Sequence, residues 1–139
     1  LWLLATGTGI APFLSILRSD TVWQRYRRVV LVEAVRHASE LAYREELERL
    51  KREHEGRFGT VTFVSREQAP GTLAGRIPPA ILDGRLEAAA GAALAAAGSQ
   101  VMICGNPDRV ADSVAVLAQR GMKKHRRRNP GHITVENYW

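Results

Sequence analysis

The sequence predicts an α/β fold: a three-layer α/β/α domain with a mostly parallel five-stranded sheet. Short apolar runs typical of buried strands alternate along the chain with segments of helical periodicity. Strands joined through helices form right-handed crossovers, which place helices on both faces of a parallel sheet. At 139 residues and 45% hydrophobic content, the chain is long enough to bury one such core.

The predicted strands are apolar or rich in β-branched residues. Residues 1–5 are entirely apolar, as expected of a strand covered on both faces. Residues 60–67 are instead rich in β-branched side chains. The five predicted strands span residues 1–5, 29–35, 60–67, 101–105 and 132–139.

The predicted helices lie between these strands. Pro12 falls in the first turn of one helix, where its missing N–H needs no partner. Ser39 is the expected N-cap of another, and Gly56 lies beyond that helix's end. The alanine-rich residues 88–98 fit either a helix or a surface loop. The predicted helices span residues 12–18, 39–54, a short segment from 77, and 109–121.

Composition argues against a disulfide-linked, secreted or membrane-spanning protein. Cys104 is the single cysteine, so no internal disulfide forms, which agrees with a reducing, cytoplasmic setting. Residues 1–17 are apolar but lack the basic start of a signal peptide. The Gly7-Thr8-Gly9 turn and Pro12 would also interrupt a membrane helix, so no membrane association is expected.

A basic run accounts for much of the net charge of +6. It could contact nucleic acid, an acidic protein or phosphates, or lie in solvent. The chain has no recognisable nucleic-acid reading motif, so a nucleic-acid partner is not expected. The run comprises Lys123, Lys124, Arg126, Arg127 and Arg128.

Polar and glycine residues follow four of the predicted strands, at the edge where parallel sheets bind ligands. The Gly7-Thr8-Gly9 turn precedes a helix, whose free N–H groups suit a phosphate. Pro12 occupies the last place of the dinucleotide fingerprint G-x-G-x-x-G, so this is not the usual loop, and a plain turn is the alternative. One extended ligand could also reach Arg36, the Ser65–Arg66 pair and residues 104–107.

Three arginines, Arg36, Arg66 and Arg76, lie after or near strand ends. Guanidinium groups bind phosphate through forked, charge-assisted hydrogen bonds, so their joint placement favours NADP over NAD. Each arginine taken alone could be a surface charge. Glu33 points the other way, because a carboxylate about 24 residues beyond Gly9 could bind a ribose and favour NAD.

Two further side chains have a structural and a functional interpretation. Cys104 is either a small core hydrophobe or part of a nicotinamide pocket. Trp139, after Tyr138, either packs on the core or stacks on a planar cofactor. No Ser-His-Asp set and no metal-ligand spacing is evident, so no metal is expected.

Six segments together resemble the NADP-binding half of bacterial ferredoxin (flavodoxin)–NADP⁺ reductases. They occur in the family's order over nearly the whole chain, and the resemblance weakens only at residues 88–100. The segments read "ATGTGIAPFLSIL", "VEAVRHASELAY", "VSRE", "GRIP", "VMICGNP" and "GHITVENYW".

The resemblance implies a role for each matching position. A first group borders the pyrophosphate and nicotinamide: Gly7, Thr8, Gly9, Ile10, Ala11 and Pro12. Arg36, Arg66 and Arg76 hold the 2′-phosphate. In the group Cys104, Gly105, Asn106 and Pro107, the cysteine approaches the nicotinamide, while Glu136 and Trp139 lie near the flavin. Cys104, Glu136 and Trp139 are thus the catalytic candidates, with Trp139 covering the flavin ring.

The resemblance also implies an activity and partners. The full-length protein would exchange a hydride between NADPH and FAD, and electrons with a ferredoxin or flavodoxin docked on a basic surface. In that family FAD binds mainly to an N-terminal β-barrel, which residues 1–139 do not contain and which we expect in the full-length protein. The protein is expected to be a monomer, and the isolated domain is expected to be inactive. A non-catalytic NADP(H)-binding or sensing module is the alternative.

Overall fold

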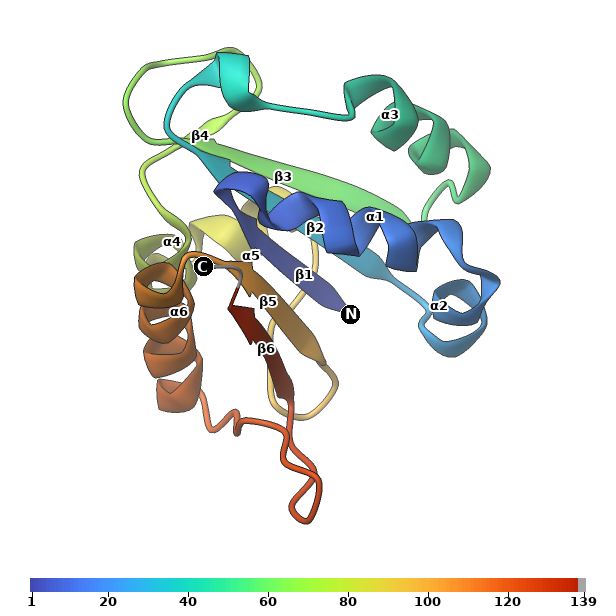
Figure 1. The fold of residues 1–139 in the computed structure, drawn as a ribbon, viewed down its shortest axis with the longest axis vertical. Coiled ribbons are helices and arrows are strands. Elements are labelled where there is room, and N and C mark those ends of the chain that lie inside the picture. Colours follow the sequence, from blue (N-terminus) through green and yellow to red (C-terminus); the bar gives the residue numbers. More distant parts are fainter. Residues whose placement is uncertain (138–139) are drawn as a thin grey trace.

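The computed structural model describes residues 1–137, apart from the side chains of Thr8 and Asn137. Its centre is a parallel six-stranded sheet with the strand order β4-β3-β2-β1-β5-β6 (Figure 1). The fold class is therefore as predicted, with one strand more than expected. The strands are β1 (Trp2–Thr6), β2 (Val29–Val35), β3 (Phe58–Val64), β4 (Leu73–Ala74), β5 (Val101–Gly105) and β6 (Ile133–Asn137).

Helices cover both faces of the sheet and give the predicted three layers (Figure 1). Leu3, Ala5 and Leu31 point to one face, where they pack with α1, α2 and α3. Leu4 and Val32 point to the other, where they pack with α4, α5 and α6. The helices are α1 (Ile10–Arg18), α2 (Asp20–Arg25), α3 (Arg44–Glu53), α4 (Ile77–Asp83), α5 (Arg85–Ala90) and α6 (Pro107–Gln119).

Strand β1 lies between the two halves of the sheet. Trp2 pairs with Val30 of β2 on one side and with Val101 of β5 on the other. The strand order therefore reverses at β1, and all strands end at one common edge. Ligands of open parallel sheets bind in the crevice outside such a reversal.

The buried strands agree best with the sequence predictions. Strands β2 and β5 have the predicted bounds, and β1 differs by one residue at each end. Strand β3 begins and ends earlier than predicted, because it pairs in register with β2 from Val29↔Phe58 to Val35↔Val64. Helix α1 begins two residues before Pro12, which remains in its first turn. The last strand ends at Asn137 among the described residues.

The prediction that Ser39 caps a helix over residues 39–54 is wrong. Ser39 lies in a separate 3-10 turn, Ala38–Glu40, where Glu40 Oε1 accepts a hydrogen bond from His37 N at 2.9 Å. Helix α3 starts only after Tyr43, whose φ of 61° is left-handed. A local side-chain bond thus closes the first turn and leaves the chain extended before α3.

Helix α2 and strand β4 were not predicted, α5 was not predicted as a helix of its own, and one ambiguous segment is settled. Helix α2 and the two-residue strand β4 are both short; β4 pairs only with Phe63 and Val64. Gly84, at φ 85°, separates α4 from α5. Of the alanine-rich residues 88–98, the first three complete α5 and the rest form a loop with Leu94 buried. Within the described part of the chain, no helix is long and apolar enough to cross a membrane.

Candidate functional site

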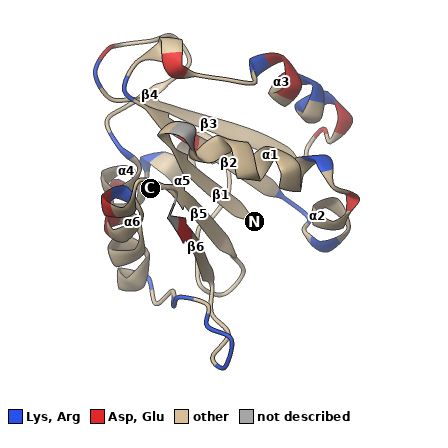
Figure 2. Ribbon diagram, in the orientation of Figure 1, with Lys and Arg blue, Asp and Glu red and all other residues tan. Residues whose placement is uncertain are grey.

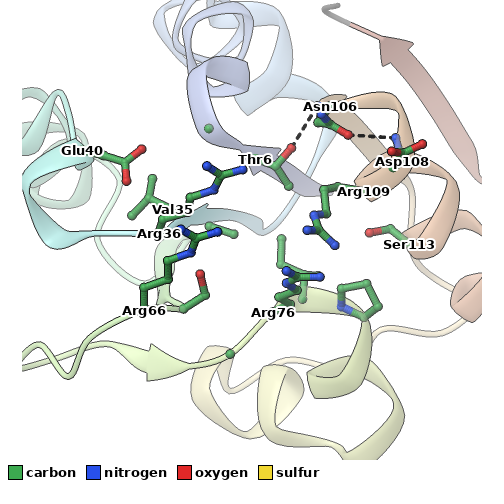
Figure 3. A pocket seen from close by; sticks show the side chains of 16 residues that line it. Thr6, Val35, Arg36, Glu40, Arg66, Arg76, Asn106, Asp108, Arg109 and Ser113 are labelled. Atoms are coloured by element: carbon green, nitrogen blue, oxygen red, sulfur yellow. Dashed lines mark hydrogen bonds between the residues drawn. The ribbon is translucent and has the colours of Figure 1, made fainter.

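A cleft of about 610 Å³ opens at the carboxyl edge of the sheet (Figure 3). Its walls come from the ends of β1, β2 and β3, the start of α4 and the start of α6. This is the place where the strand order reverses. The lining residues that the following paragraphs use are Thr6, Gly7, Arg36, Glu40, Ser65, Arg66, Arg76, Asn106, Asp108, Arg109 and Ser113.

The structure brings the three predicted arginines together in this cleft (Figure 3). Arg36 and Arg66 lie beside each other because the β2–β3 pairing continues past the strand ends. Ser65 N donates to Val35 O and Arg66 N to Arg36 O, each at 3.0 Å. Arg76 immediately precedes α4. Three separate loops therefore direct guanidinium groups into one space.

These three guanidinium groups have no carboxylate partner in residues 1–137 within 4.0 Å. Side-chain hydrogen bonds from arginine in this part of the chain come from other positions. They are Arg18, Arg28, Arg57, Arg85 and Arg120. The cleft is therefore a site of unpaired positive charge, which suits a ligand with several phosphates.

Contacts between the ends of β1 and β5 fix the floor of the cleft. Thr6 Oγ1 accepts a hydrogen bond from Asn106 N at 3.2 Å, and Asn106 Oδ1 accepts from Asp108 N at 2.9 Å, capping α6 (Figure 3). A Cβ on Gly105 would lie 1.9 Å from Thr6 Oγ1, and one on Gly9 would lie 2.4 Å from Cys104 O. The two glycines let these loops approach each other, a role that the phosphate interpretation did not include.

The predicted loop from Gly7 to Pro12 is only partly at the cleft. Gly7 lines it, at a φ of 56°. Ile10 is buried in the core on the α1 face, and Ala11 is exposed at the start of α1. Pro12 is half-buried. The side chain of Thr8 lies outside the part of the chain that the structure describes.

Two of the three predicted catalytic residues, Cys104 and Glu136, lie near the same edge but outside the cleft lining. Cys104 is fully buried on the α1 face, where burial and then the charge of Glu136 raise the pKa of its thiol. Glu136 is exposed on β6, at the position paired with Cys104. Pro107 is the first residue of α6. Trp139 lies outside the described residues, as does Tyr138.

Glu33 does not lie in the cleft. It shares a sheet face with Leu31 and is 4% exposed, below Arg44 and Lys51 of α3. Its Oε2 atom is buried without a hydrogen-bond partner among the described residues. Burial raises the pKa of this carboxyl to about 7, and the Ala42 N–H and the charge of Arg44 oppose that rise. Glu33 is therefore not placed to bind a ribose in the cleft.

Sequence reasoning missed several cleft residues on α6 and after β2. Arg109 and Ser113 are four residues apart, so they share one face of α6, and that face lines the cleft. Ser113 is 1% exposed. This spacing was visible in the sequence, but which face of α6 meets the cleft was not. Glu40 and Asp108 add two carboxylates to the lining.

The basic run forms a loop at the opposite end of the sheet. Lys123 to Arg128 are exposed and precede β6, so they lie at its amino end, away from the cleft (Figure 2). The loop is held by backbone hydrogen bonds, including His125 N to Ile133 O at 2.7 Å and a reciprocal pair between Arg126 and Asn129.

Comparisons with known proteins agree with the fold. The chain is 47% identical over 140 residues to a flavodoxin/ferredoxin–NADP reductase of Shigella flexneri and 46% identical to that of Escherichia coli; each match covers 100% of the chain and 56% of the relative. A Neisseria gonorrhoeae ferredoxin–NADP⁺ reductase, solved with bound FAD and NADP, superimposes with a TM-score of 0.92 at 37% identity, covering 99% of this chain and 55% of that one. The chain thus spans about half the length of the relatives it matches.

The resemblance drawn from the motifs is confirmed at the level of the domain family. The profile of the oxidoreductase NAD-binding domain matches residues 3–115, from the start of β1 to the middle of α6. This region contains the whole sheet apart from Trp2 and β6. It also contains every residue that lines the described cleft. The protein therefore belongs to the oxidoreductase NAD-binding domain family.

Proposed function

We propose that this chain is the NADP(H)-binding part of a flavoprotein reductase that exchanges a hydride between NADPH and FAD. One observation carries the proposal: three guanidinium groups, from Arg36, Arg66 and Arg76, converge without carboxylate partners in the described cleft. NADPH brings a 2′-phosphate and a pyrophosphate, which match such a site. The reductases to which the chain is similar are named for NADP.

The cleft favours NADP over NAD. A 2′-phosphate carries a charge near −2 and accepts forked hydrogen bonds from arginine. Glu33, the carboxylate predicted as a candidate ribose ligand, lies on the other face of the sheet. Arg36 and Arg66 are held beside each other by the backbone, so both can contact one phosphate.

The other roles in this proposal concern how the chain holds the dinucleotide. Gly7 and Asn106 line the cleft on either side of the β1–β5 contact, where a pyrophosphate can approach the backbone. When bound, NADPH supplies the hydride. Cys104, Glu136 and Trp139 are proposed to border the nicotinamide and the flavin, and FAD is proposed to bind mainly to a β-barrel domain encoded before Leu1.

For the electron partner, we propose an acidic ferredoxin or flavodoxin in the cytoplasm, with the reductase as a monomer. The five cations between Lys123 and Arg128 support electrostatic docking. This loop lies at the amino end of β6, whereas the cleft lies at the carboxyl edge of the sheet. The five-residue length of β6, about 17 Å, therefore separates the loop from the cleft edge. Replacing Lys123, Lys124 and Arg126 with glutamate should slow ferredoxin reduction at low salt by the full-length protein. An unchanged rate would move docking elsewhere.

Nucleotide binding to this chain is the first test. Calorimetric titration should show NADPH binding at least tenfold more tightly than NADH, which is about 1.4 kcal/mol. Equal affinity for both nucleotides, or none for NADPH, would contradict the proposal.

The second test separates an enzyme from a nucleotide-sensing module. The chain is expressed together with the segment encoded immediately before Leu1. A yellow protein that NADPH bleaches supports the reductase. A colourless protein that binds NADPH supports the sensing module.

A further inference from the structure

Arg109 is a fourth arginine of the cleft, which no sequence motif had indicated. It is the third residue of α6 and points into the cleft from the same side as Arg76 (Figure 3). Ser113 follows on the same helix face and also lines the cleft. Arg109 therefore faces the space that Arg36 and Arg66 enter from the opposite wall.

The guanidinium of Arg109 has one weak partner in the described part of the chain. Its Nη1 lies 3.9 Å from Asp112 Oδ2, which is beyond hydrogen-bond distance. The Asp112 side chain is 60% exposed, so water screens this ion pair. Most of the hydrogen-bond donors of Arg109 therefore remain available to a ligand.

Its position is electrostatically unfavourable for the folded chain alone. A cation in the first turn of a helix faces the positive end of the helix dipole. Three further guanidinium groups share the cleft, against the carboxylates of Glu40 and Asp108. Glu40 already accepts a hydrogen bond from His37 N. Positive charge is thus concentrated where folding does not require it, and a bound anion would remove the repulsion.

We infer that Arg109 is a specificity-determining residue that binds the 2′-phosphate of NADP(H) together with Arg36, Arg66 and Arg76. The inference rests on the proposed function. The pyrophosphate is the alternative target. It is less suited, because the Gly7 turn and the start of α1 provide backbone N–H groups for it, whereas Arg109 points into the space shared by the other cleft arginines (Figure 3).

The test measures nucleotide affinity of the chain with Arg109→Ala. We expect NADPH and 2′,5′-ADP, which keeps the 2′-phosphate but lacks the pyrophosphate bridge, to bind about tenfold more weakly. NADH should bind as it does to the unmodified chain. Urea unfolding should give a free energy equal to or above that of the unmodified chain, because the variant loses an unfavourable charge.

Arg52→Ala is the matched control. Arg52 is an exposed arginine of α3, so its removal changes net charge equally but away from the cleft. It should leave all three affinities unchanged.

Unchanged NADPH binding by Arg109→Ala, an equal loss for NADH, or a lower unfolding free energy would each overturn the inference. If the unmodified chain fails to bind NADPH while folded, the proposed function itself fails. If Arg66→Ala weakens NADPH binding and Arg109→Ala does not, only the inference fails.

Discussion

The two ends of helix α6 hold arginines in opposite environments. At the carboxyl end, Arg120 donates hydrogen bonds to the Glu87 carboxylate and to the carbonyl oxygens of Ile81 and Leu94, and its charge suits the helix dipole. At the amino end, Arg109 faces the cleft with Asp112 at 3.9 Å as its one ion-pair partner among the described residues. One residue type therefore does two different jobs on one helix.

The contrast between arginines bonded within the chain and arginines facing the cleft also holds outside α6. Arg57 resembles Arg120: it donates to the carbonyl oxygens of Trp23, Tyr26 and Arg27 and ties α2 to the start of β3. The cleft arginines resemble Arg109. An arginine whose donors are used by the chain stabilises the fold, whereas one held in a cleft without such partners indicates an anionic ligand.

Removal of Arg120 should give the largest effect on stability. Arg120→Ala leaves the half-buried Glu87 and two carbonyl groups without their partner. We expect the free energy of unfolding to fall by about 2–4 kcal/mol. Urea denaturation followed by circular dichroism measures the change. A loss no larger than that of a cleft-arginine variant would break the comparison.

Glu33 extends the comparison to a buried side chain. Like the cleft arginines, its carboxyl group has no ion-pair partner in the described chain, but it lies in the core instead of facing the cleft. Its pKa is raised from 4.5 to about 7 by burial. The folded state therefore holds the proton more tightly than the unfolded state. This contribution to stability is complete below about pH 4.5 and is lost as the pH rises to about 7, and it amounts to about 3 kcal/mol at most.

Glu33→Gln removes this titration. Between pH 5 and pH 8 the unmodified chain should lose about 2–3 kcal/mol of stability that the variant keeps. Urea unfolding at four pH values across that range measures the difference. Parallel pH profiles for the two proteins would show that Glu33 does not carry this dependence.

Arg66→Ala should separate ligand binding from stability. The loss of a charge-assisted hydrogen bond to the 2′-phosphate is worth about 1.5–3 kcal/mol, or about 10- to 150-fold in NADPH affinity. NADH lacks that phosphate, so its affinity should not change. Calorimetric titration of both nucleotides tests this. Equal losses would make Arg66 a structural residue like Arg120.

Arg36→Ala should have the smallest effect on folding. Its side chain is exposed and has no ion-pair partner in the described chain, so we expect the free energy of unfolding to change by less than about 0.5 kcal/mol. NADPH affinity should fall as it does for Arg66→Ala. A clear loss of stability would place Arg36 with the structural arginines.

The sequence by itself determined the alternation of strands and helices and the bounds of the two strands that flank β1. Residues 29–35 and 101–105 are apolar runs buried by helices on both faces, so their pattern and their structure coincide. Because parallel strands end at one edge, the sequence also predicted that Arg36, Arg66 and Arg76 would share a cleft.

The tertiary structure decided features that depend on distant partners. Strand β4 forms because its two residues pair with Phe63 and Val64 of β3. The late start of α3 is a different case, because the bond from His37 to Glu40 and the left-handed Tyr43 are local features that the helix prediction missed. The face that α6 turns to the cleft, and with it the role inferred for Arg109, depends on how that helix packs over the sheet. Local sequence sets which residues share a helix face, but only packing between elements sets what that face meets.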